Sequence, residues 1–138
     1  MTTLVPDLTM QINERIYVSE LVDAVADVYN VTREHVMAKV RHALPVEMRA
    51  LVYHKARAHG ITLYAIGRVM GKDHSTVSNQ SNKMLPEEAR PFVRQLPAFD
   101  RTAPYVRCRA CAGIGLVSGQ QHDVCPCCLG TGGARACR

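Results

Sequence analysis

The sequence predicts an all-α helix-turn-helix domain of about five short helices, followed by a small irregular cysteine-rich unit. Apolar residues recur at helical spacing through the middle of the chain, where two short segments flank a glycine-bearing turn at residues 71–73. All six cysteines and six of the nine glycines fall within residues 108–138. A 138-residue chain has room for one ordinary domain or two small ones.

The first two helices are predicted from their end signals. Residues 1–17 are interpreted as a flexible N-terminal arm, and Ser19 as the N-cap of a helix that ends at Asn30. Thr32 is positioned to cap a second, short helix that ends near a basic loop containing Lys39 and Arg41.

Three further helices are predicted downstream. Pro45 suits the first turn of a helix that Gly60 ends, and the residues expected to face inward are Met48, Leu51, Val52 and Ala56. Thr62 begins the next helix, in which Leu63, Ile66 and Met70 share one apolar face and which Gly71 ends. A polar helix starting near His74 follows, with Val77 and Met84 as its main apolar anchors.

The amino-acid composition changes after residue 84. Four prolines between residues 85 and 107 indicate a stiff linker with one short helix, and residues 108–138 form the cysteine-rich unit. The domain boundaries expected are therefore 1–17, 18–84, 85–107 and 108–138.

Charge is concentrated in the middle of the chain. Residues 31–84 carry nine basic and three acidic side chains, whereas the first thirty residues carry one basic and five acidic. Such a field suits DNA, RNA or an acidic membrane surface, although solubility alone is an alternative. The sequence shows neither an 18-residue apolar run nor a secretory signal at its start, so we expect a cytoplasmic protein that does not enter a membrane.

The composition of the polar helix favours base reading. The second helix of a helix-turn-helix lies in the major groove, where short donors and acceptors distinguish bases. Asp73 is expected to cap this helix or to accept from a cytosine amino group, and Lys72 and Lys83 to contact phosphates. The alternative is a solvated helix of poor propensity. The base-reading side chains expected are His74, Ser75, Thr76 and Asn79.

"DHSTV", preceded by "IGRVMGK" and by "VYNVTREHVMAKVR", resembles the C-terminal DNA-binding domain of the bacterial replication initiator DnaA over about residues 18–84. The resemblance implies that Asp73, His74, Ser75 and Thr76, with Asn79 one turn on, read the major groove of a DnaA-box-like site. It also implies backbone or minor-groove contacts near Lys39 and Arg41, and a contact by Arg49 at the start of the third helix. The loop here carries fewer arginines than that of the family, and Met48-Arg49 replaces the family's Arg-Gln.

Nucleotide binding is not expected. The segment "GRVMGKD" is one residue shorter than a P-loop and ends in an aspartate, which would repel phosphate. Without the initiator's ATPase, such a chain would occupy DNA sites, compete for them or recruit other proteins to them.

Two copies of C-x-x-C-x-G-x-G, "CRACAGIG" and "CPCCLGTG", predict one structural Zn²⁺. The expected ligands are Cys108, Cys111, Cys125 and Cys128. Cys127, Cys137 or, less plausibly, His122 are alternatives, and reduced thiols without a metal are the other interpretation. The motif is similar to the cysteine-rich region of the DnaJ co-chaperones, but the chain contains no "HPD" signature, so chaperone activity is not implied.

Together these features predict a non-enzymatic, sequence-specific binder of double-stranded DNA that regulates replication initiation or transcription, in a bacterium or a phage. A homodimer is plausible because one helix-turn-helix reads few base pairs. The alternative is an interaction factor that acts on a host polymerase or initiator through its zinc unit.

Overall fold

The computed structural model describes residues 8–38, 43–85, 87–109 and 125–135. In these ranges the elements follow in the order α1 (Leu8–Tyr29), α2 (Arg33–Met37), α3 (Ala43–Ala58), α4 (Leu63–Met70), α5 (His74–Ser81), α6 (Arg90–Val93), β1 (Tyr105–Arg107) and β2 (Gly133–Arg135). The predicted fold class is confirmed: a mostly helical protein contains a helix-turn-helix and a small irregular cysteine-rich region.

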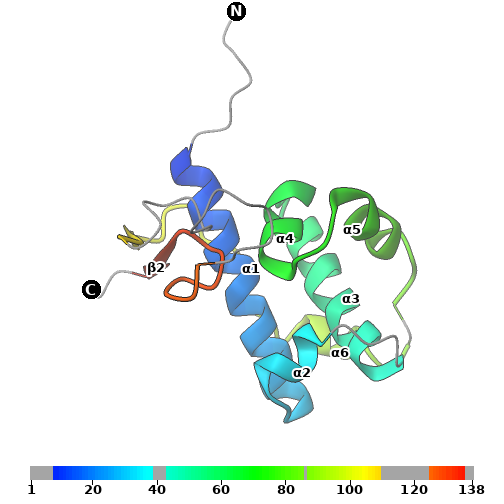
Figure 1. Cartoon of the computed structure of the whole chain (residues 1–138). Helices are drawn as coiled ribbons and strands as arrows, with labels where there is room; N and C mark the ends of the chain where they lie inside the picture. The colour runs from blue at the N-terminus through cyan, green and yellow to red at the C-terminus, as the bar shows by residue number, and fades with distance from the viewer. Residues whose placement is uncertain (1–7, 39–42, 86, 110–124, 136–138) are drawn as a thin grey trace, which may run out of the picture.

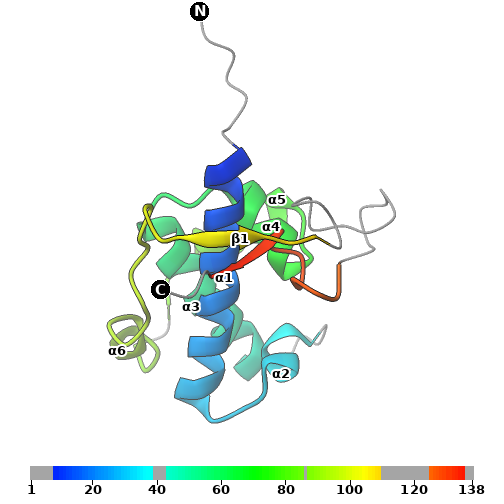
Figure 2. The same cartoon turned by 90° about the vertical axis from the view of Figure 1, so that its left-hand side faces the viewer.

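Helix α1 runs through the centre of the molecule (Figure 1). It packs against α2, α3 and α4, and α5 in turn packs against α3 and α4. The short strands β1 and β2 pair antiparallel, with Val106 opposite Ala134. They cross α1 on the side away from α5 (Figures 1 and 2).

The predicted end signals from Asn30 to Gly71 are present in the structure. Thr32 and Thr62 each accept a hydrogen bond from the backbone N–H three residues on, as N-cap residues do. Asn30, Gly60 and Gly71 adopt the left-handed conformation that ends a helix.

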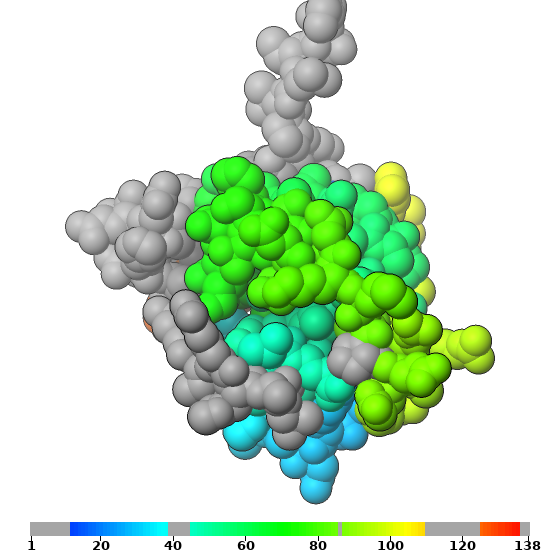
Figure 3. All heavy atoms as spheres, turned by 90° about the vertical axis from the view of Figure 1, so that its right-hand side faces the viewer, coloured from blue at the N-terminus to red at the C-terminus, as the bar shows by residue number. Residues whose placement is uncertain are grey.

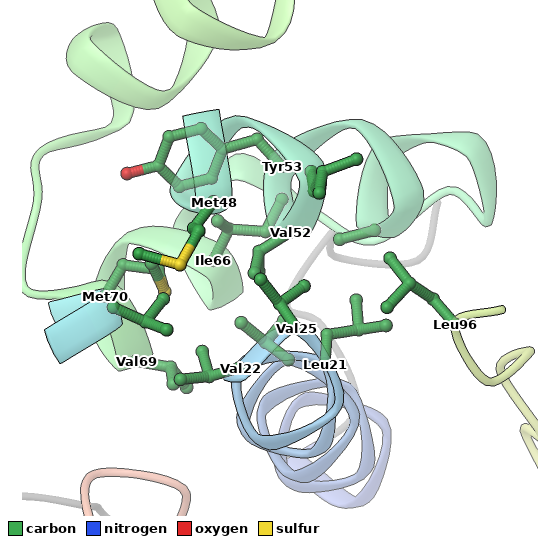
Figure 4. Packing of buried hydrophobic residues seen from close by; sticks show 14 of the residues in the cluster. Leu21, Val22, Val25, Met48, Val52, Tyr53, Ile66, Val69, Met70 and Leu96 are labelled. Atoms are coloured by element: carbon green, nitrogen blue, oxygen red, sulfur yellow. The ribbon is translucent and has the colours of Figure 1, made fainter. Parts of the chain in front are cut away.

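The core lies between α1, α3 and α4 (Figure 4). The apolar faces predicted for α3 and α4 are inside it: Met48, Leu51, Val52, Ala56 and Ile66 are each 0% exposed. Removing these side chains from water is the main source of stability for a domain of this size.

The prediction of a flexible arm at residues 1–17 is wrong from residue 8 onward. Helix α1 begins at Leu8, so Ser19 lies within it and is not its N-cap. Ile12 and Tyr17 are fully or almost fully buried. The interpretation failed because residues far along the chain cover this part of α1: Gly133 lies beside Ile12, and the ring of Phe99 packs on that of Tyr17.

Residues 87–109 are also more than a linker. Leu96 and Ala89 are buried in the core, and the hydroxyl of Tyr17 donates to the backbone carbonyl of Pro97 at 2.6 Å. The proline-rich segment therefore packs along the domain and brings β1 back to α1.

Within the described residues, no helix has both the length and the apolar character needed to cross a membrane.

Candidate nucleic-acid interface and metal centre

Helices α4 and α5 are joined by three residues, Gly71 to Asp73, as the sequence predicts. The tight turn depends on Gly67, because a Cβ at that position would lie 2.5 Å from the backbone carbonyl oxygen of Lys72. The N–H of Lys72 also donates to the carbonyl of Gly67 at 3.0 Å. These contacts fix the direction in which α5 leaves α4, which makes the pair a helix-turn-helix.

Helix α5 is held by one apolar residue and turns its polar residues outward. Val77 is 0% exposed, as predicted. Met84 was predicted as the second anchor, but it lies beyond the end of α5 and is 81% exposed. Helices α4 and α5 (green) form much of one face of the molecule (Figure 3).

The predicted base-reading residues lie together on this helix. His74, Ser75 and Asn79 are exposed, and Thr76 is half-buried. With Asp73 as the N-cap, the first turn of α5 presents an imidazole and two hydroxyls to solvent. These groups can donate to and accept from base edges.

Asp73 is engaged as a cap. Its Oδ1 accepts from the backbone N–H of Thr76 at 2.7 Å and from the hydroxyl of Ser75 at 3.0 Å. The hydrogen bond from the N–H of Thr76 is the main reason why the pKa of this carboxyl lies below its usual value. Because the hydroxyl of Ser75 already donates to Asp73, its oxygen can only accept a further hydrogen bond from a ligand.

The predicted phosphate contacts divide into two groups. Lys72 is half-buried and Lys83 is exposed, and they lie on either side of α5. Lys39 and Arg41 lie outside the described residues.

The predicted DNA contact by Arg49 is contradicted. This side chain is only 8% exposed, and its Nη1 donates to the carbonyls of Val36 at 3.3 Å and Ala38 at 2.6 Å. A guanidinium suits this position because it satisfies carbonyls left unpaired where α2 ends. Arg49 therefore joins α2 to α3 inside the protein.

A pair on α4, Tyr64 and Arg68, is not among the residues that the sequence predicts for the site. Arg68 Nη2 donates to the Tyr64 hydroxyl at 3.0 Å, and its guanidinium carbon lies 5.4 Å from the centre of the Tyr64 ring. Tyr64 is 60% exposed. The four-residue spacing of the two on a predicted helix was the signal for this pairing.

Three of the four predicted metal ligands lie close together in the structure. The thiol sulfurs of Cys108, Cys125 and Cys128 all lie within 4.8 Å of one another, and those of Cys108 and Cys125 are 3.8 Å apart. Cys111 lies outside the described residues, as do Cys137 and His122, whereas Cys127 is exposed. Three thiols this close together can bind a metal ion.

The backbone around the cysteines favours the thiolate form. The N–H of Gly132 donates to Cys128 Sγ at 3.2 Å. The hydrogen bond from the backbone N–H of Cys128 is the main reason why the pKa of Cys125 is lowered to about 7. Thiolate is the form that ligates metals. Gly132 adopts a positive φ of 91°, which allows the loop to turn beneath the sulfurs.

Comparison with known proteins supports the first of these two sites. No curated protein and no solved structure gave a significant match to the chain. Residues 18–84 match the family model described as the bacterial DnaA protein helix-turn-helix. This segment, which ends just after the polar helix, is therefore similar to the DnaA helix-turn-helix, and that similarity suggests DNA binding.

Proposed function

We propose that this protein is a cytoplasmic, non-enzymatic regulator that binds double-stranded DNA at DnaA-box-like sites. Its role would lie in replication initiation or transcription, without an ATPase of its own. The observation that carries the proposal is the exposure of a polar first turn of α5 on a rigid helix-turn-helix. That turn is anchored by Val77 and capped by Asp73.

The roles divide according to side-chain chemistry. His74, Thr76 and Asn79 contact base edges, and Ser75 acts there as an acceptor. Asp73 holds the first turn in place, since its Oδ1 is already used by Thr76 and Ser75. The phosphate contacts are assigned to Lys72 and Lys83, with Lys39 and Arg41 from the loop before α3.

Arg68 is added to the phosphate contacts. The first helix of a helix-turn-helix crosses the DNA backbone, and Arg68 lies on that helix with its guanidinium held by Tyr64. An arginine that a neighbouring ring already orders loses less freedom when it binds a phosphate.

We also assign one structural Zn²⁺ to the cysteine centre, with Cys108, Cys111, Cys125 and Cys128 as ligands. Four thiolates suit the tetrahedral preference of zinc, and three of these sulfurs are already gathered. A fully ligated ion would leave no open position for catalysis.

The test begins with selection of bound fragments from random duplex DNA by the zinc-loaded chain. Affinities of the selected site and of scrambled DNA are then compared for His74→Ala, Thr76→Ala and Lys72→Ala, with Gln95→Ala as an exposed control outside the helix-turn-helix. The first two should cost about 1–3 kcal/mol on the selected site and relax specificity. Lys72→Ala should weaken binding to both DNAs alike, with a shallower salt dependence. Equal losses on both DNAs for all three variants would refute base reading by α5.

A role in protein interaction is the second candidate. The strands lie on the side of α1 away from α5 (Figure 1), and Val106 and Leu129 are 57% and 48% exposed. Both side chains would remain available while α5 occupies DNA, for a protein partner or a second copy of the chain. Val106→Ser and Leu129→Ser should then abolish partner retention or self-association, measured by sedimentation, without changing DNA affinity.

A further inference from the structure

Three consecutive polar residues near the start of α1, Asn13, Glu14 and Arg15, are buried. Their exposed fractions are 2%, 8% and 3%. Polar and charged side chains are rarely buried unless partners compensate the loss of water. The partners of these three residues lie in three separate parts of the chain: Thr62, residues 100–101 and residues 131–135.

Arg15 faces the cysteine centre. Its Nε donates to the backbone carbonyl of Thr131 at 2.7 Å, in a buried contact. The hydroxyl of Thr131 lies 2.8 Å from the carbonyl oxygen of Cys128 and 2.7 Å from that of Gly133. Arg15 therefore holds the same loop that carries the thiol of Cys128.

Asn13 reinforces this attachment. Its Nδ2 donates to the carbonyls of Asp100 and Arg101 at 3.2 and 2.9 Å, and its Oδ1 accepts from Arg135 on β2. Arg135 also forms an ion pair at 2.8 Å with Glu20, about two turns further along α1. The cysteine-rich region is thus fixed to α1 through several hydrogen bonds to side chains.

Glu14 faces the helix-turn-helix instead. Its Oε2 accepts from the hydroxyl of Thr62 at 3.3 Å. Thr62 is the N-cap of α4, and the same hydroxyl oxygen accepts from the N–H of Ala65 at 3.1 Å. Glu14 therefore supports the start of the helix that carries the reading helix α5.

We propose that the Asn13–Arg15 segment couples metal occupancy of the cysteine centre to the DNA-binding competence of the helix-turn-helix. Metal binding orders the loop around Thr131, the loop holds Arg15, and the adjacent Glu14 then supports the N-cap of α4. The coupling to DNA affinity rests on the proposed function, whereas the coupling to α4 does not.

Thermodynamic linkage sets the size and the symmetry of the effect. Couplings between distinct sites commonly change affinity between about fivefold and 150-fold, and they are reciprocal. Metal removal should therefore weaken DNA binding by about tenfold, and bound DNA should raise the affinity for Zn²⁺ by the same factor.

The first test is hydrogen exchange of the full chain without DNA, zinc-loaded and after chelation. Removal of Zn²⁺ should accelerate exchange in the first half of α1 and at Ala65 to Met70 of α4. The amides of α2, which packs at the other end of α1, should change little (Figure 1). A loss of protection shared equally by α2 and α4, or no change in α4, would overturn the proposal.

Substitution of Arg15 then tests whether this residue connects the cysteine-rich region to α4. Arg15→Met keeps much of the side-chain volume but cannot donate to Thr131, so the zinc-loaded variant should exchange in α4 like the metal-free wild type. Arg15→Lys, which retains a donor, should restore part of the protection. Arg33→Met is the matched control, since Arg33 also binds α1, through Ser19 and Asp23, but not the cysteine-rich region. Equal responses of α4 in the Arg15→Met and Arg33→Met variants would show that Arg15 is not the link. The wild-type comparison remains decisive if a variant fails to fold.

Measurements of DNA affinity with and without Zn²⁺ distinguish a failure of the coupling from a failure of the proposed function. The ratio of DNA affinities with and without Zn²⁺ should be about ten in the wild type and in Arg33→Met, and near one in Arg15→Met. A ratio near one in the wild type would overturn the coupling to DNA affinity. Failure of the zinc-loaded chain to bind any duplex would refute the proposed function, while the exchange experiment would still decide the coupling to α4.

Discussion

Gly67 on α4 lies directly against the backbone of Lys72, so that a Cβ at Gly67 would come within 2.5 Å of the Lys72 carbonyl oxygen. Real Cβ atoms do not approach another atom this closely, and the atom in question belongs to backbone. The close packing of the turn against α4 therefore depends on the absence of a side chain at this position.

Gly67→Ala should destabilise the protein by about 1–3 kcal/mol, although alanine is the better helix former, because the turn must move to admit the methyl group. Urea unfolding of the zinc-loaded chain measures this. Gly71→Ala is the comparison: Gly71 has a φ of +68° but nothing within 4 Å, so only backbone strain of about 1–2 kcal/mol is expected. A Gly67→Ala variant as stable as the wild type would contradict the account of the turn.

The carboxylate of Asp73 should make the stability of the protein depend on pH. Because hydrogen bonds hold its folded-state pKa below the ordinary value of 3.8, its contribution is complete above that value and is lost as the pH falls through the folded-state pKa. Asp73→Ala should lower the melting temperature at pH 7, and Asp73→Asn should lower it less because asparagine also caps helices. Thermal unfolding of the three proteins from pH 7 downward through the folded-state pKa measures this, and the differences in melting temperature between wild type and the variants should shrink over that range. A difference that stays constant with pH would mean that the charged cap is not responsible.

Arg49→Met should destabilise the protein by about 1–3 kcal/mol, since the carbonyls of Val36 and Ala38 lose a buried donor. Arg94→Met, at an exposed position after α6, should change the stability by less than about 0.5 kcal/mol. Urea unfolding gives both values. In addition, DNA affinity of folded Arg49→Met should remain within about twofold of wild type, and a larger, salt-dependent loss would return Arg49 to the DNA contacts.

Cys128→Ser should abolish the binding of one Zn²⁺ per chain, whereas Cys127→Ser should leave it intact. The thiol of Cys128 is one of the three gathered sulfurs, and Cys127, its neighbour in sequence, is exposed. Native mass spectrometry gives the stoichiometry, and release of Zn²⁺ to a colorimetric chelator gives the affinity. If Cys128→Ser retained the metal and Cys127→Ser lost it, Cys127 would be the ligand in place of Cys128.

Much of the helix-turn-helix was predictable because its determinants are local. Thr62, Gly71 and Asp73 act on backbone groups within a few residues of themselves, and Val77 can be recognised from the sequence of α5 alone as its single apolar residue. The pairing of Cys108 with Cys125 and Cys128 was also predictable, since the repeated motif specifies ligand chemistry and spacing.

Residues whose roles depend on distant parts of the chain were misassigned. Arg49 looks like a DNA contact until the end of α2 is found beside it, and Met84 looks like an anchor until the helix ends before reaching it.

The sequence by itself determined the N-caps of α2, α4 and α5, the inward faces of α3 and α4 and the side-chain chemistry of the two candidate sites, because each depends on spacing or on neighbours along the chain. Only the tertiary structure decided that residues 12–17 are core and that Asn13, Glu14 and Arg15 join the cysteine centre to α4. Those side chains are buried by segments about 50 to 120 positions away, so their environment exists only after the chain has folded.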